Sequence, residues 1–146
     1  MSITKTLSIA AAAALGMAAT AAPAMAAFPP NTSLTLTGTL TLSQSVTIDC
    51  DVSVDISVDA SGVPTITGRS FAPGSFLCGG VVQPAGTWDI TLGPGPSAVT
   101  LTIGATSILG SCSDTVVAAL SGTSITFNNV VVAGAPSNCT VDGTLS

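Results

Sequence analysis

The chain has very few of the residues that most enzymes use for catalysis. Its 146 residues include no His, no Tyr and no Glu, and the only cations are Lys5 and Arg69. General acid–base catalysis relies mainly on His, Asp, Glu, Lys and Tyr, and Ser or Cys nucleophiles usually need a His as their base. A zinc site with His ligands is excluded as well. The composition therefore argues against an enzyme and predicts no catalytic residues.

Positive charge is equally scarce. The formal net charge is −5, and all seven acidic residues are Asp. Nucleic-acid binding requires a cationic surface, so nucleic acid is not an expected partner. We also expect no transmembrane segment, because no apolar run reaches the roughly 20 strongly apolar residues that a spanning helix needs.

The first 26 residues have the pattern of a secretory signal peptide. A weakly basic start (1–5) precedes an Ala-rich apolar stretch (7–22) and a small-x-small cleavage site, Ala24-Met25-Ala26. A retained anchor is the alternative, but the apolar stretch is short and consists mostly of Ala. We therefore expect residues 1–26 to be removed and residues 27–146 to form one exported domain, secreted or held at the cell surface.

The rest of the chain consists of short alternating segments separated by Gly, Pro and Ser. Residues 34–42 alternate Leu with Thr, with Gly38 in one of the Leu positions, and residues 46–59 alternate apolar residues with Thr, Ser and Asp. Such period-two patterns indicate strands with one buried face. The second segment would span about 40 Å, so a bulge is expected in it. Eight or nine strands spaced in this way predict an all-β fold, an antiparallel β-sandwich of the Ig-like or Greek-key type.

Four cysteines, Cys50, Cys78, Cys112 and Cys139, indicate two disulfides in an exported chain. Four cysteines allow three pairings. In both halves a Cys is followed by a strand, a Ser-Gly turn, a second strand and an Ala-Pro loop before the next Cys. This repeat favours Cys50–Cys78 and Cys112–Cys139, although chance similarity among Ser- and Thr-rich strands would look the same.

Several short motifs carry a resemblance to a known family. They are Leu77-Cys78-Gly79, Pro84-x-Gly86-Thr87-Trp88, Gly110-x-Cys112 and the closing segment 137–145. Together with the signal peptide, they resemble the bacterial family called protein activator of alkane oxidation, the small secreted Pra-type proteins. The resemblance covers most of residues 27–146. It implies a small exported bacterial protein linked to growth on hydrocarbons, and it supplies no catalytic residues.

Acidic residues gather on one face of the second alternating segment, which holds Asp49, Asp51, Asp55 and Asp59. Asp49 and Asp51 would lie about 6.6 Å apart and could share a Ca²⁺ ion. The chain lacks a calcium-loop motif, so a solvated face is the favoured interpretation. We expect no cofactor, with calcium at Asp49 and Asp51 as the weaker alternative.

A second pair of acids, Asp89 and Asp114, could be imagined as a glycosidase pair. Sugar sites normally offer several aromatic platforms, and this chain has a single Trp. We therefore do not expect these two residues to form a catalytic site.

The aromatic residues are the candidates for contact with apolar material. Phe71 and Phe76 lie in a Pro- and Gly-containing segment that could expose them to a partner or an oil surface, and Trp88 could stack on a ligand. The alternative is that all three belong to the core. Arg69 is expected to pair with an Asp or to lie on a loop near Phe71.

The sequence thus favours a non-enzymatic exported protein at the cell surface or in the medium that aids contact with hydrocarbon or other apolar material. One alternative is a fibre or biofilm-matrix subunit that self-associates by strand addition through residues 27–42. A second alternative is a calcium-dependent adhesive module.

Overall fold

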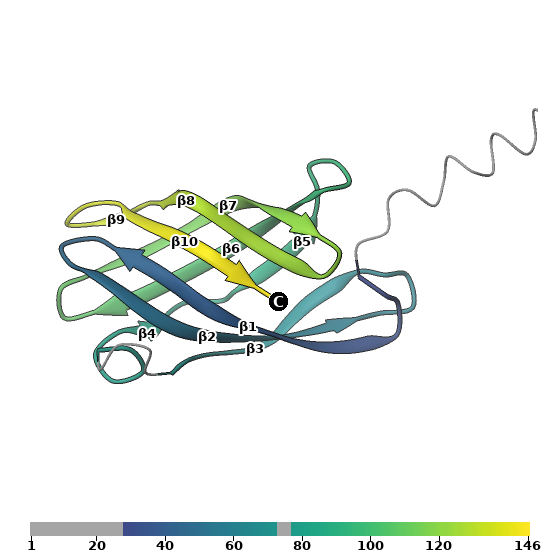
Figure 1. The fold of residues 1–146 in the computed structure, drawn as a ribbon, viewed down its shortest axis with the longest axis horizontal. Helices are drawn as coiled ribbons and strands as arrows, with labels where there is room; N and C mark the ends of the chain where they lie inside the picture. Colours follow the sequence, from purple (N-terminus) through teal and green to yellow (C-terminus); the bar gives the residue numbers. More distant parts are fainter. Residues whose placement is uncertain (1–27, 73–76) are drawn as a thin grey trace, which may run out of the picture.

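A computed structural model describes residues 28–72 and 77–146, and this part of the chain is built from strands (Figure 1). The expected all-β antiparallel fold is confirmed. The ten strands are β1 (Thr32–Ser43), β2 (Thr47–Val58), β3 (Pro64–Ala72), β4 (Gln83–Pro84), β5 (Asp89–Leu92), β6 (Ala98–Ser107), β7 (Gly110–Ser121), β8 (Ser124–Val132), β9 (Gly134–Ala135) and β10 (Cys139–Leu145).

The strands form one sheet in the order β3-β2-β1-β10-β8-β7-β6-β4, with β5 also paired to β6 and β9 to β7. The sheet curls until its edge strand β3 contacts β5 and β4 at the other edge, which gives a nearly closed, barrel-like arrangement. A sandwich of two separate sheets is therefore not confirmed. Long, strongly twisted hairpins can wrap one sheet around the core, and the alternating pattern is the same in both architectures.

The alternation in β1 and β2 determines which face turns inward. The two strands pair without a break from Thr32↔Val58 to Ser43↔Thr47. The apolar positions of β2 are buried from Cys50 to Val58 and half-buried at Ile48, and its Asp positions are exposed. The irregularity expected in this segment lies in its pairing with β3, where the register shifts between Asp55 and Ile56.

Two disulfides join distant parts of the sheet. Cys50 on β2 is bonded to Cys78 in the loop after β3, with a Cα–Cα distance of 5.5 Å. Cys112 on β7 is bonded to Cys139, the first residue of β10, with a Cα–Cα distance of 6.1 Å. This is the pairing that the sequence repeat favours. Cross-links of this kind stabilise a fold whose buried core contains few aromatic rings.

A glycine permits the close approach of β1 to the C-terminal strand. A Cβ atom added at Gly38 would lie 2.0 Å from the carbonyl oxygen of Thr144. Beside this position, Thr37 and Ser146 exchange two backbone hydrogen bonds of 3.0 Å. β1 is thus an inner strand, hydrogen-bonded to β2 on one side and to the C-terminal segment on the other.

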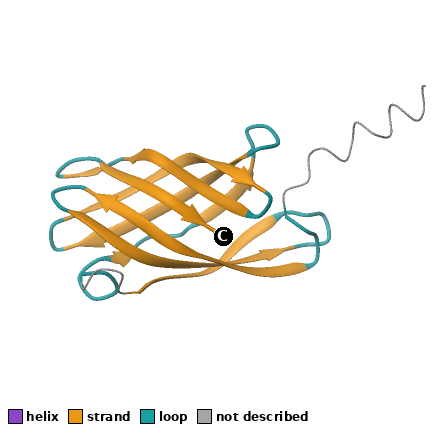
Figure 2. Ribbon diagram, in the orientation of Figure 1, coloured by secondary structure: helices purple, strands orange, loops and turns teal. Residues whose placement is uncertain are grey.

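The loops gather at the two ends of the sheet, as Figure 2 shows. One end carries the β1–β2 turn (44–46), the β6–β7 turn (108–109) and the segment from β8 to β10, and we call it the pocket end. The opposite end carries the β2–β3 turn (59–63) and the β7–β8 turn (122–123). This division matters because the apolar pocket described below opens at the first of these two ends.

Candidate functional site: an apolar pocket at one end of the sheet

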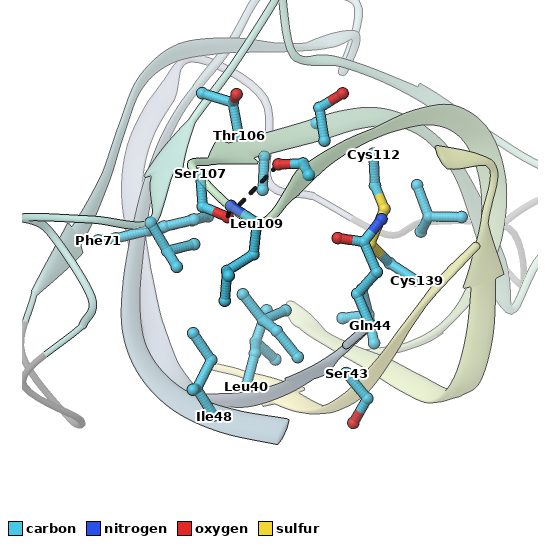
Figure 3. Close-up of a pocket in the computed structure, with 18 of the residues that line it drawn as sticks. Leu40, Ser43, Gln44, Ile48, Phe71, Thr106, Ser107, Leu109, Cys112 and Cys139 are labelled. Atoms are coloured by element: carbon cyan, nitrogen blue, oxygen red, sulfur yellow. Dashed lines mark hydrogen bonds between the residues drawn. A yellow bond between two sulfur atoms is a disulfide. The ribbon is translucent and has the colours of Figure 1, made fainter. Parts of the chain in front are cut away.

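A cavity of about 100 Å³ opens at the pocket end and reaches into the core (Figure 3). Its walls come from strands at opposite sides of the sheet, and no charged side chain is found among the described residues that line it. The apolar lining consists of Leu40, Leu42, Val46, Ile48, Phe71, Leu77, Val81, Val82, Trp88, Ile103, Ala105, Leu109, Phe127, Val132, Val141 and Leu145, together with the Cys112–Cys139 bridge.

Polar side chains at the mouth of the pocket are engaged with the protein itself. The Gln44 amide Nε2 donates to the carbonyls of Ala135, at 3.2 Å, and Ser137, at 2.7 Å. The Ser107 hydroxyl accepts the Leu109 N–H at 3.0 Å. Among the described residues, no buried side-chain N or O atom lacks a hydrogen-bond partner. The pocket therefore offers a ligand mainly apolar contacts.

Three exposed apolar side chains, Val46, Ile108 and Leu109, stand on the two turns at the pocket end, and we call them the apolar rim. Their exposed fractions are 45%, 89% and 43%. Val46 and Leu109 also line the pocket, whereas Ile108 points away from it into solvent. Sequence reasoning did not single out this rim. The sequence feature that could have indicated the rim is the apolar pair Ile108-Leu109, because polar residues usually occupy turns.

Two of the predicted aromatic contact residues form an inner wall of the pocket. Trp88 is only 7% exposed, and Phe71 meets its ring edge-on, with ring centroids 6.0 Å apart. The Arg69 guanidinium lies 5.9 Å from the Trp88 ring centroid and donates a hydrogen bond to the Gly86 carbonyl. Trp88 is thus a buried wall residue and not an exposed stacking platform. The third candidate, Phe76, lies outside the described residues.

The acidic face of β2 is engaged with β1 by a ladder of hydrogen bonds. Threonine hydroxyls on β1 donate to the carboxylates directly opposite them. The pairs are Thr35–Asp55 at 2.7 Å, Thr39–Asp51 at 2.8 Å and Thr41–Asp49 at 2.7 Å. Asp59 instead accepts the amides of Ser61 and Val63 and closes the β2–β3 turn. Within residues 28–72 and 77–146, no three His, Cys, Asp or Glu side chains are grouped as metal ligands.

The second acid pair, which was not expected to form a catalytic site, is separated by a strand. Asp89 lies on β5 and Asp114 on β7, with β6 between them. The two carboxylate oxygens of Asp114 accept the N–H groups of Thr115, at 2.8 Å, and Ala133, at 3.2 Å. Asp114 therefore holds β7 to the segment that follows β8, which is a structural role.

These features define a small, disulfide-linked, all-β protein with an apolar pocket and a separate acidic face. The chain belongs to the alkane oxidation protein activator PraA/PraB-like family, whose model matches residues 1–146, the whole chain. No curated protein and no solved structure matches the chain. The part of the chain that the structure describes contains no helix long and apolar enough to cross a membrane.

Proposed function

We propose that this protein is a non-enzymatic, exported protein that adheres to hydrocarbon or other apolar material through its pocket end. The observation that carries the proposal is the apolar rim, above all Ile108 with 89% of its side chain exposed beside the mouth of an apolar pocket. Single exposed apolar residues are common, but a group of them around an apolar opening is typical of a binding surface.

The distribution of charge supports an oriented contact. The carboxylates of Asp49, Asp51 and Asp55 lie on the outer face of the β1–β2 hairpin, where water solvates them. The pocket lining carries no charged side chain among the described residues. A molecule with this asymmetry lowers its free energy at an oil–water boundary by turning the pocket end towards the oil and the acidic face towards water.

Other features agree with export and with a role outside catalysis. Two disulfides suit an oxidising compartment. The family takes its name from the activation of alkane oxidation. The chain also lacks His, Glu and Tyr, on which most acid–base catalysis depends. An accessory protein that brings hydrocarbon to the cell fits all three observations without a catalytic site.

The two alternative functions receive less support. Strand addition through residues 27–42 would require β1 to leave both of its neighbours, since it pairs with β2 along its whole length and with β10 over Leu40–Ser43. A calcium-dependent adhesive module would have to bind the ion at Asp49 and Asp51, each of which already accepts a threonine hydroxyl.

Adsorption to a hexadecane–water interface tests the proposal. The full 146-residue chain is expressed, and the purified protein is compared with its Ile108→Ser and Val63→Ser variants. Val63 is a matched control because it is 54% exposed and belongs to the turn at the opposite end. Burying one Ile side chain favours adsorption by about 1.5–3 kcal/mol. We therefore expect Ile108→Ser to weaken adsorption roughly tenfold and Val63→Ser to leave it unchanged. Equal adsorption by all three proteins would refute the proposal.

A further inference from the structure

The pocket continues inward well beyond the apolar rim. Val46 and Leu109 stand at its mouth, whereas Phe127, Val141 and Leu145 are buried residues that line its inner part. A cavity of about 150 Å³ lined by aliphatic side chains is known to stay dry and to bind benzene. The cavity here, at about 100 Å³, is smaller but large enough for a short apolar segment. Water gains little from entering its inner part, because the described residues there are mostly apolar and none leaves a buried side-chain polar atom without a partner.

We propose that this pocket binds the methyl end of one unbranched alkyl chain from a free, single-chain molecule. The inference rests on the proposed function and deepens it, because it replaces general adhesion by stoichiometric recognition of one chain. The described residues of the lining carry no charge, which disfavours an ionic ligand. The small volume favours a narrow chain over a ring or a branched end, and the open mouth lets the rest of the chain leave between Val46 and Leu109.

The same geometry predicts what the pocket recognises. Each methylene that moves from water into an apolar site tightens binding about fourfold. Affinity should therefore rise with chain length over the first few carbons and then level off, once the inner part of the pocket is full. The nature of the head group should matter little, because most of the lining is apolar and both Gln44 Nε2 and the Ser107 hydroxyl are hydrogen-bonded within the protein.

Titration with straight-chain alcohols tests the binding. The purified full-length protein is titrated with 1-butanol, 1-hexanol, 1-octanol and 1-decanol below their solubility limits. The fluorescence of Trp88 reports binding, because it is the only Trp in the chain and lines the pocket. We expect saturable 1:1 binding that tightens over the shorter members of the series and then levels off. Octyl methyl ether should bind within about twofold of 1-octanol, and cyclo-octanol at least tenfold more weakly.

Two outcomes of this titration would overturn the inference. One is the absence of saturable binding. The other is equal affinity for 1-octanol and cyclo-octanol, since that result would mean non-specific adsorption only. Phosphatidylcholine vesicles test whether the bound alkyl chain comes from a membrane lipid or from a free molecule. We expect them neither to change Trp88 fluorescence nor to compete with 1-octanol, and competition would assign the site to membrane lipid instead of a free alkyl chain.

A substitution that fills the pocket with a larger side chain gives the most direct test. Ala105 on β6 lines the pocket opposite Cys112, so Ala105→Phe places a ring inside it. Ala119→Phe is the matched control, because Ala119 is exposed on the outer face of β7. We expect Ala105→Phe to weaken 1-octanol binding at least tenfold and the control to leave it unchanged. Should Ala105→Phe fail to fold, Val81→Phe fills the pocket from the loop wall and decides the question.

These experiments can refute the adhesion proposal and the pocket proposal independently of each other. Ile108 does not line the pocket, so Ile108→Ser should lower adsorption to hexadecane while the dissociation constant for 1-octanol stays within about twofold. Loss of adsorption together with normal 1-octanol binding would support both proposals. Normal 1-octanol binding by both filled variants, each with an unchanged melting curve, would refute the pocket and leave the adhesive end intact.

Discussion

The indole N–H of Trp88 donates a hydrogen bond of 3.0 Å to the carbonyl of Gly104. The same carbonyl accepts the backbone N–H of Ala85, also at 3.0 Å. The segment before β5 is thereby held directly over β6, and the Trp88 ring is fixed as a wall of the pocket. This contact is possible only because residue 104 has no side chain.

The first prediction concerns this close approach. A Cβ atom at residue 104 would lie 2.7 Å from the Ala85 carbonyl oxygen, so Gly104→Ala must push the segment away from β6. We expect a loss of about 1–3 kcal/mol in the free energy of unfolding, measured by urea denaturation. Gly80→Ala is the control, because a Cβ there meets no atom within 4 Å. Equal stability of the two variants would contradict the packing described.

The second prediction concerns the Thr–Asp ladder. Thr39→Val keeps the shape of the side chain and removes the hydroxyl that donates to Asp51. The expected loss in unfolding free energy is below about 1 kcal/mol, because the pair is exposed to water. Thr37→Val is the control, since Thr37 lies opposite Ser53 and not an Asp. A larger loss in the control would show that the ladder does not stabilise the hairpin.

The third prediction concerns calcium. Because Asp49 and Asp51 accept threonine hydroxyls, we expect millimolar Ca²⁺ to leave the melting temperature unchanged and to produce no binding heat in calorimetry. A ligand that binds only the folded state raises the free energy of unfolding by RT ln(1 + [L]/Kd), where [L] is the free ligand concentration. A clear rise in melting temperature, abolished by Asp51→Asn, would restore the calcium-dependent module.

The fourth prediction concerns the disulfides. Each bridge closes a loop of nearly equal length, with sequence separations of 28 and 27 residues. The chain-entropy model then predicts that removing either bridge by a double Cys→Ser substitution lowers the unfolding free energy by about 3–4 kcal/mol. Peptide mapping without reduction checks the pairing. A fragment that joins Cys50 to Cys139 would exclude it.

The fifth prediction concerns self-association. β1 is an inner strand, so deletion of residues 27–42 should destroy the fold itself and abolish the β-type circular dichroism spectrum. The intact protein should elute as a monomer in size-exclusion chromatography. High-mass species from the intact chain, together with a deletion variant that still folds, would favour the fibre subunit.

Period-two alternation determined much of this fold without any tertiary information. It located the long β1 and β2 strands and assigned their apolar positions to the interior, because side chains of a strand alternate between its two faces. The repeated spacing also favoured the pairings Cys50–Cys78 and Cys112–Cys139 that the structure contains. The family was evident from short motifs around the cysteines and Trp88, and it matches the whole chain.

The closed sheet, the pocket and the apolar rim depended on the tertiary structure. Alternation tells which face of a strand is buried but not which strand lies beside it, so the pairing of β1 with β10 and the contact of β3 with β5 were not predictable. Val46 and Leu109 lie 63 positions apart in the sequence. Both line one opening because two hairpins end at the same end of the curled sheet. Non-local pairing thus places two turns that are far apart in the sequence at the mouth of one apolar pocket.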